Sequence, residues 1–339
     1  MAKEEVSRPV RKARWLVIIV NMLFIGAIFA TLVYRSDPLS RYPYGTREQR
    51  EVMAERFTHQ DIDILINSQI RPEQILPFMD MPGFDINNTI YYDLVAKTQT
   101  ADPDFVVQFV NRYRNRLNVN NIQEILSWMS YPDVVAYFDS KNETPLSKNP
   151  KAYDFYLYPN TTLGTWRPSD LVQVQDLLSL REEAAQQWNA MKEAAAQEGI
   201  DLQAISGFVA YENQRHMTEY KSMPLAPYGS REEQLGLTLY LDGYDLWNQT
   251  LSAMEDEQYD FLHAIGTLTD QQRAVRDWLE LHAAEYGFIL RYPQGKEEQT
   301  HVLYQPFVIR YVTQDVAQNL KDNNLCLEEY QEQGEEHGN

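Results

Sequence analysis

The stretch from Glu285 to Val312, EYGFILRYPQGKEEQTHVLYQPFVIRYV, decides the fold of this chain. It begins with GFILRY, a short run of β-forming residues that ends at Pro293, and continues with the polar segment QGKEEQ. A second run, VLYQPFVIRYV, is rich in Val, Ile, Tyr and Phe. Two such runs separated by a polar turn predict two adjacent strands. We expect these strands to form the floor of a pocket, with Gln305 to Val308 facing the pocket or the core.

The same stretch carries a frame of residues at 286–293, 295–297, 300, 304, 306 and 310–312. This frame resembles the end of the VanY-type D-alanyl-D-alanine carboxypeptidases, zinc peptidases of bacterial cell-wall peptides, with the pattern YGFILRYP-x-GK-E-x-TGY-x-YEPWHFRYVG. The chemical positions differ from that pattern. Gln305 stands where the family has its general-base Glu, Val308 where it has a metal-binding His, and Phe307 where it has Trp.

A second block, residues 206–214, reads SGFVAYENQ. It is similar to the family pattern SGYR-S/T-YExQ, whose Arg is expected to bind the substrate carboxylate. Ser206, Tyr211 and Gln214 match, whereas Val209 occupies the Arg position. A valine cannot pair with a terminal carboxylate, so the resemblance implies that the anchor for a free C-terminus is missing.

A third block, residues 226–243, reads APYGSREEQLGLTLYLDG. The corresponding family pattern is PGxSEHQLGLAxD, in which the His and the Asp hold zinc. Gln234 matches, but Glu233 replaces the His and Tyr240 replaces the Asp. A catalytic zinc needs about three protein ligands; Glu233 could be one in principle, Tyr240 is a poor substitute and Val308 cannot bind zinc.

The resemblance therefore implies the family's fold without its catalytic groups, because a glutamine at position 305 cannot accept a proton as a general base. We expect an α+β fold, a small antiparallel sheet flanked by helices, preceded by a helical subdomain and one N-terminal transmembrane helix. We expect no catalytic residues at the degenerate positions and no bound zinc. The candidate substrate-binding residues are Ser206, Tyr211, Gln214, Gln234 and Tyr240.

The alternative hypothesis is an active zinc D-alanyl-D-alanine carboxypeptidase whose ligands have been rerouted. The candidate ligands are Glu233, His216, Asp242 and His301. Asp242 lies two residues beyond Tyr240 along a predicted strand, so it would be displaced by roughly 6–7 Å from the family position.

Residues 15–34, WLVIIVNMLFIGAIFATLVY, form an uncharged run of twenty residues, which is long enough to cross a bilayer as a helix. Basic residues precede it at positions 3, 8, 11, 12 and 14. The positive-inside rule then places the N-terminus in the cytoplasm and the remainder outside the cell membrane. A cleaved signal peptide is the competing interpretation, but the apolar run is long and no small-x-small site follows closely.

Composition and turn residues divide the chain further. We expect a cytoplasmic tail (1–14), the transmembrane anchor (15–34), a linker (35–45), a helical subdomain (46–150), a carboxypeptidase-like domain (151–330) and a polar tail (331–339). Within these, the patterns predict helices over 103–117, 177–198, 270–285 and 315–330, a strand over 203–210 and a loop over 131–150.

The chain of 339 residues carries a net charge of −19, which argues against a nucleic-acid partner. The single cysteine, Cys326, excludes an internal disulfide and a cysteine-rich zinc site. Two partner hypotheses follow from the resemblance and the anchor. In the first, the domain binds a peptidoglycan stem peptide through the cleft that corresponds to the family's active site. In the second, it acts as a regulatory subunit for an envelope protein partner.

Overall fold

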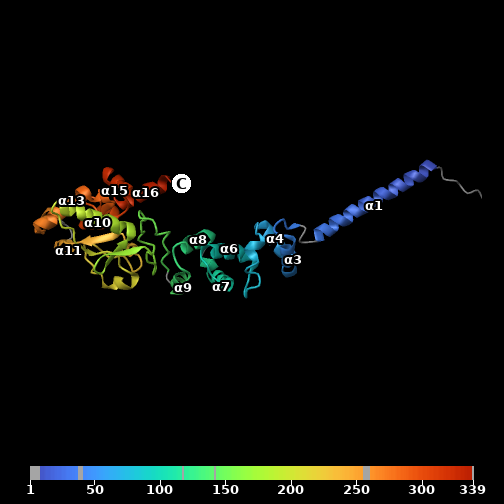
Figure 1. The fold of residues 1–339 in the computed structure, drawn as a ribbon, viewed down its shortest axis with the longest axis horizontal. Helices are drawn as coiled ribbons and strands as arrows, with labels where there is room; N and C mark the ends of the chain where they lie inside the picture. The colour runs from blue at the N-terminus through green and yellow to red at the C-terminus, as the bar shows by residue number, and fades with distance from the viewer. Residues whose placement is uncertain (1–7, 37–40, 117, 141–142, 255–259, 338–339) are drawn as a thin grey trace, which may run out of the picture. The chain divides into compact units, whose positions relative to one another are not determined.

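The computed structural model describes residues 8–36, 41–116, 118–140, 143–254 and 260–337 (Figure 1). Its internal contacts divide the chain into two units, Met1–Gln123 and Glu124–Asn339. This boundary lies earlier than the division at residue 150 expected from the sequence. The described residues between 124 and 150 therefore belong to the second unit.

The first unit begins with the long helix α1 (Arg8–Ser36). Within it, Arg14–Leu32 has a mean hydropathy of 2.4 and none of this segment is buried. By length and composition this segment could cross a membrane, and it coincides closely with the predicted anchor.

Short helices form the rest of the first unit. They are α3 (Arg47–Arg56), α4 (His59–Asn67), α5 (Pro72–Ile75), η1 (Ile86–Asn88), α6 (Thr89–Thr98), α7 (Pro103–Tyr113), η2 (Arg114–Arg116) and α8 (Val119–Leu126), whose last turn crosses the boundary. Thr46 and Thr58 start α3 and α4 with capping boxes, which satisfy free amide groups of the first turn. Met53, Ile62 and Leu65 anchor the apolar core of this unit.

The second unit is built on a four-stranded antiparallel sheet with the order β3-β4-β6-β5. Its strands are β3 (Ala204–Ser206), β4 (Thr238–Leu241), β5 (Phe288–Tyr292) and β6 (Gln305–Tyr311). The predicted pair of strands in the 285–312 stretch is confirmed, since β5 and β6 are hydrogen bonded with Leu290 opposite Ile309. The strand predicted over 203–210 is confined to β3. A separate hairpin joins β1 (Leu171–Gln175) to β2 (Leu178–Arg181).

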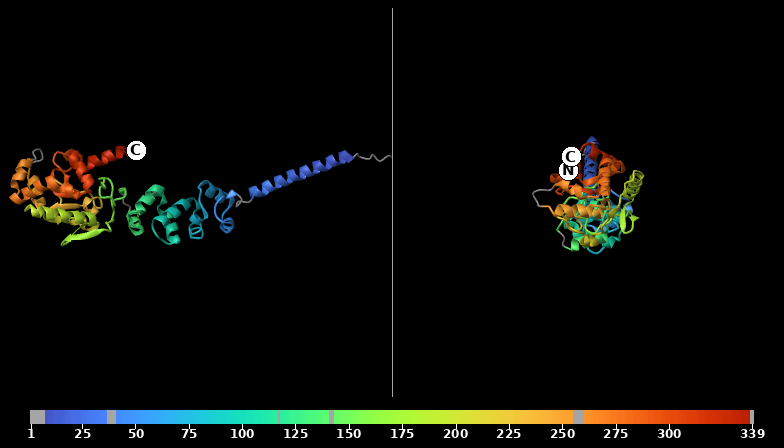
Figure 2. Two further views of the ribbon diagram at one scale, coloured as in Figure 1. Left: turned by 45° about the horizontal axis from the view of Figure 1, so that its top comes forward. Right: turned by 90° about the vertical axis from the view of Figure 1, so that its left-hand side faces the viewer.

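The second unit also contains helices, several of which flank this sheet (Figure 1). They are α9 (Tyr131–Asp139), α10 (Glu182–Gln197), η3 (Tyr211–His216), η4 (Glu232–Leu235), α11 (Tyr244–Ser252), α12 (Phe261–Thr267), α13 (Asp270–His282), η5 (Ala283–Tyr286), α14 (Glu297–Thr300), α15 (Gln314–Asp322) and α16 (Leu327–His337). Figure 2 shows α15 and α16, both red, at the same side of this unit, where Leu320 and Leu327 share one apolar cluster. The expected α+β class, with a small antiparallel sheet and flanking helices, is confirmed.

Three predicted elements differ from the observed ones. The segment 131–150 is not a continuous loop, because α9 occupies its first half; Ser130 caps the helix and Val134 is buried. The helix predicted from residue 177 begins at Glu182, since β2 uses the residues before it. The helix predicted over 315–330 is two helices, and the break contains Asn324 at a φ of 51°.

Candidate functional site

The structure brings together the three positions at which the VanY pattern has metal ligands. Tyr240 on β4 lies directly opposite Val308 on β6 in the strand register. The hydroxyl of Tyr240 donates a hydrogen bond to Oε1 of Glu233, which comes from η4. All three residues are buried. The sequence blocks that resemble the family thus converge in space, as the resemblance implies.

The side chains at these positions do not fit a zinc ion. Burial raises the pKa of Glu233, which favours its neutral form, and burial together with the Glu233 carboxyl raises the pKa of Tyr240. A zinc ligand must give up its proton, whereas these two groups are hydrogen bonded to each other in a setting that favours the protonated forms. Val308 offers only methyl groups. A buried, hydrogen-bonded pair of side chains therefore occupies positions at which the family pattern has metal ligands.

Gln305 occupies the general-base position, and both polar atoms of its side-chain amide are already hydrogen bonded. Gln305 is fully buried, and its amide exchanges two hydrogen bonds of 3.0 Å with the amide of Asn248 on α11. The Asn248 Oδ1 atom also accepts a 2.6 Å bond from Ser222 Oγ. This closed network uses the amide nitrogen of Gln305 as a donor, a role that a carboxylate cannot fill.

Val209, which occupies the remaining family position, lies next to the same cluster. Its N–H donates a 3.2 Å hydrogen bond to the carbonyl oxygen of Glu233. The chain therefore keeps the local backbone path at this position but presents a half-buried apolar side chain there.

Two of the five candidate substrate-binding residues lie inside the protein. Gln214 and Gln234 are buried, and Nε2 of Gln214 donates a 2.8 Å bond to Oε1 of Gln234. Gln234 in turn donates to the carbonyl oxygens of Gly164 and Trp166, and Gln214 accepts from the N–H of Gly229. The two amides join three segments of the domain, so their contacts are structural.

The other three candidates either reach the surface or line a cavity. Tyr211 on η3 is exposed, and its ring packs edge-on against Tyr228. Ser206 and Tyr240 contribute to a cavity of about 250 Å³. Its lining consists of Ile205, Ser206, Met217, Thr218, Tyr240, Tyr244 and Asp245. We call this space the Tyr240 cavity.

The sequence interpretation missed five residues of the Tyr240 cavity: Ile205, Met217, Thr218, Tyr244 and Asp245. Tyr244 and Asp245 follow β4 through a turn at Gly243, whose φ of 102° favours glycine. A Cβ atom at Gly243 would lie 2.8 Å from the ring of Phe307. The dipeptide Asp242-Gly243 signals this turn, but it does not reveal which cavity the next side chains line.

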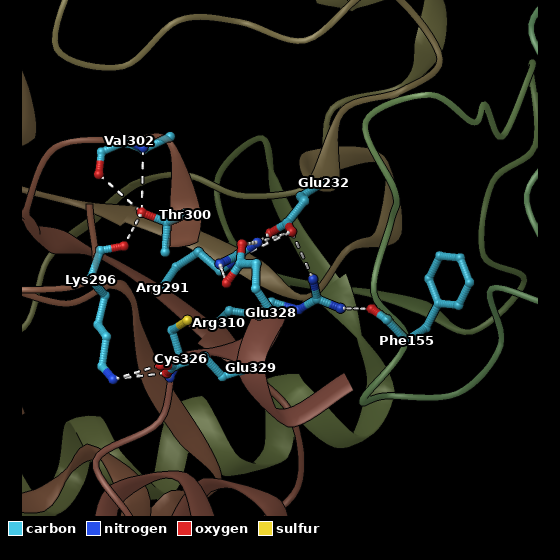
Figure 3. A network of polar contacts seen from close by, with 10 residues as sticks. All are labelled: Phe155, Glu232, Arg291, Lys296, Thr300, Val302, Arg310, Cys326, Glu328 and Glu329. Atoms are coloured by element: carbon cyan, nitrogen blue, oxygen red, sulfur yellow. Dashed lines mark hydrogen bonds and ion pairs between the residues drawn. The ribbon is translucent and has the colours of Figure 1, made fainter. Parts of the chain in front are cut away.

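A buried network of charges supports the site (Figure 3). Arg291 on β5 binds the Glu232 carboxylate with bonds of 2.7–3.0 Å and also binds Glu328 on α16 at 2.8 Å. Arg310 on β6 approaches Glu232 at 3.1 Å. Burial alone would raise the pKa of Glu232, but Arg291 and Arg310 outweigh it and lower this pKa to about 2. Glu232 is therefore ionised next to Glu233, which burial drives toward the neutral form.

The rerouted ligands of the alternative hypothesis do not form a recognisable cluster. His216 and His301 are exposed, and His216 Nε2 accepts a 3.0 Å bond from Arg215. Asp242 is exposed beyond the end of β4 and contacts Gln272. Within the part of the chain that the structure describes, no three His, Cys, Asp or Glu side chains are grouped as a metal site would require.

Part of this chain is similar in sequence to known proteins. Residues 177–314 match the family model VanY, described as D-alanyl-D-alanine carboxypeptidase. The putative carboxypeptidase YodJ of Bacillus subtilis is 31% identical over 185 residues, which cover 49% of this chain and 62% of that relative. The bifunctional D-Ala-D-Ala dipeptidase and carboxypeptidase VanXYC of Enterococcus gallinarum is 29% identical over 161 residues, covering 44% of this chain and 76% of that relative.

A solved structure of the LdcB LD-carboxypeptidase is 29% identical, covers 54% of this chain and 87% of its own, and superposes with a TM-score of 0.40. Residues 177–314 are thus similar to the VanY family, and the chain spans less than two thirds of the YodJ relative.

Proposed function

We propose that this protein is a membrane-anchored, extracytoplasmic pseudoenzyme that binds cell-wall peptide through the Tyr240 cavity. The observation that supports the proposal most strongly is the hydrogen bond between Tyr240 and Glu233 with Val308 opposite. Residues of these types cannot supply the three ligands of a catalytic zinc. Gln305 cannot act as the general base. A cavity of about 250 Å³ nevertheless remains open beside Tyr240.

The anchor in this proposal is α1. Its segment Arg14–Leu32 has the length and hydropathy of a membrane span. The basic residues that precede it in the sequence favour a cytoplasmic N-terminus. The VanY-family domain would then lie outside the membrane, where cell-wall peptides occur.

The first test is the zinc content of the full-length protein, purified in detergent and dialysed against zinc-containing buffer. We expect far less than one zinc per chain, with no release of D-alanine from a D-Ala-D-Ala peptide. About one zinc per chain together with peptide cleavage would overturn the pseudoenzyme proposal and support the rerouted enzyme.

The second test measures binding of purified muropeptides to the same protein. Thr218 is exposed at the Tyr240 cavity, so Thr218→Trp should obstruct the cavity and weaken binding. The matched control is Leu262→Trp, an exposed position on α12 that does not line the cavity. If the folded wild-type protein bound no muropeptide, the peptide-binding proposal would be wrong and the hypothesis of an envelope regulatory subunit would gain support.

A further inference from the structure

We infer that the Tyr240 cavity receives an ammonium group on an aliphatic stem, and that it does not receive the free carboxylate that the family pattern would bind. This inference rests on the proposed function, because it names the ligand chemistry of the same cavity. It reverses the charge expected of the ligand.

Two of the residues that line the Tyr240 cavity are aromatic. The rings of Tyr240 and Tyr244 both line it and meet at 74°, with 4.6 Å between their centroids. Tyr220 packs behind Tyr244 at 79° and 5.7 Å, so it holds that ring in place. The faces of aromatic rings attract cations, so the two tyrosines add surface that suits a cationic ligand.

The charge of the lining has the matching sign. Among the described residues that line the cavity, Asp245 is the one with an acidic side chain, and none of them is basic. Its Oδ1 atom accepts a 2.8 Å hydrogen bond from the hydroxyl of Tyr220, which orients the carboxylate. A ligand carboxylate would meet this negative charge without a cationic partner in the lining, and Val209 stands at the position where the family pattern has Arg.

The polar groups of the lining also match the donors of an ammonium. An alkylammonium carries three N–H donors and no acceptor. The Asp245 carboxylate and the hydroxyls of Ser206 and Thr218 supply acceptor oxygens around the cavity. Ile205 and Met217 add apolar surface, which suits the methylene stem of a lysine-like side chain.

Four synthetic peptides separate the two ligand charges. They are Nα-acetyl-Lys-D-Ala-D-Ala and Nα,Nε-diacetyl-Lys-D-Ala-D-Ala, each with a free C-terminal acid and with a C-terminal amide. Binding to the full-length protein in detergent is measured by calorimetry. We expect acetylation of Nε to weaken binding about tenfold or more, and amidation of the C-terminus to leave it within about twofold.

The matched variants are Asp245→Asn and Glu298→Gln, which neutralise one exposed carboxylate at the cavity and one on α14. Asp245→Asn should weaken binding of the Nε-free peptides about tenfold and leave the diacetylated peptides unchanged. Glu298→Gln should change neither, and unfolding midpoints should show both variants folded.

The outcomes distinguish this inference from the proposed function. Binding that requires the free C-terminal acid and ignores Nε acetylation would overturn the ammonium inference while leaving peptide binding intact. The ammonium inference would also be wrong if Asp245→Asn bound all four peptides as the wild-type protein does. Failure of the folded protein to bind any of the four would overturn both.

Discussion

The hydroxyl of Tyr240 donates a hydrogen bond to the carboxyl of Glu233, although both residues occupy positions that the VanY pattern assigns to metal ligands. The bond links the end of β4 to η4, two elements that a metal would otherwise hold together. A buried polar group is costly unless it has a partner, and each of these groups is the partner of the other. The pair therefore provides a structural link that does not depend on zinc.

Restoring the family ligands should restore metal binding. The triple variant Glu233→His, Tyr240→Asp, Val308→His places three zinc ligands at positions that already converge, since Tyr240 and Val308 are opposite each other in the sheet. We expect about one zinc per chain by elemental analysis after dialysis.

The control for the triple variant is Glu233→His alone, which should bind far less zinc because Tyr240 and Val308 remain. A folded triple variant that contains no more zinc than the single variant would show that the three positions are not arranged as the resemblance implies.

Glu233 should make the domain less stable as the pH rises. Burial raises its pKa in the folded protein, so the folded state keeps a proton that the unfolded state releases above the ordinary glutamate pKa of about 4.3. The variant Glu233→Gln keeps an acceptor for Tyr240 but does not titrate. The free energy of unfolding of this variant, minus that of the wild type, should therefore increase as the pH rises from about 4 to about 8.

Tryptophan fluorescence during urea unfolding measures this difference, because the tryptophans at 128, 166, 188, 247 and 278 all lie in the second unit. A constant difference between the two proteins across this pH range would contradict a raised pKa for Glu233.

Removing the central cation of the buried network should destabilise the domain strongly. Arg291→Met leaves Glu232 and Glu328 without the guanidinium that binds both. Breaking a buried ion pair on one side costs about 3–5 kcal/mol. The matched control is Arg167→Gln, because Arg167 pairs with Glu212 at the surface and should matter by about 1 kcal/mol or less. If urea unfolding showed the same loss of unfolding free energy for both variants, Arg291 would not be the stabilising centre of the network.

Restoring the carboxyl group at position 305 alone should be harmful. Gln305→Glu replaces the amide nitrogen that donates to Asn248 and faces the carbonyl oxygen of Ser222. A carboxylate there would be buried against acceptor oxygens. We therefore expect the free energy of unfolding, measured in urea, to fall by more than about 2 kcal/mol. Gln305→Met, similar in length and uncharged, should cost less. A variant Gln305→Glu as stable as the wild type would mean that the amide network contributes little.

Much of the domain could be predicted from the sequence because its strongest signals are local. The β-rich runs on either side of the QGKEEQ turn predicted β5 and β6, and the ordered blocks of family-like residues placed Glu233, Tyr240 and Val308 in one site. The amphipathic spacing of 103–117 likewise predicted α7. Each of these signals lies within a few neighbouring residues or within a recognisable block.

What was missed depends on contacts between distant segments. Arg291 meets Glu232 across 59 residues, and no local pattern identifies that pair. Gln214 and Gln234 matched the family blocks, but no local pattern shows that distant segments of the domain hydrogen-bond their amides. The helix α9 was hidden in a segment of Pro, Asp and Asn residues, because the burial of Val134 and Tyr137 outweighs that composition.

The bond between Arg291 and Glu328 also has a consequence for the order in which the protein can fold during synthesis. Glu328 belongs to α16, the last helix among the described residues, whereas Arg291, Arg310 and Glu232 are synthesised before it. A ribosome releases the chain from the N-terminus, so the strands emerge with two cations facing one carboxylate. The second counter-charge arrives only with α16, and the domain can reach its final form only after that helix has left the ribosome.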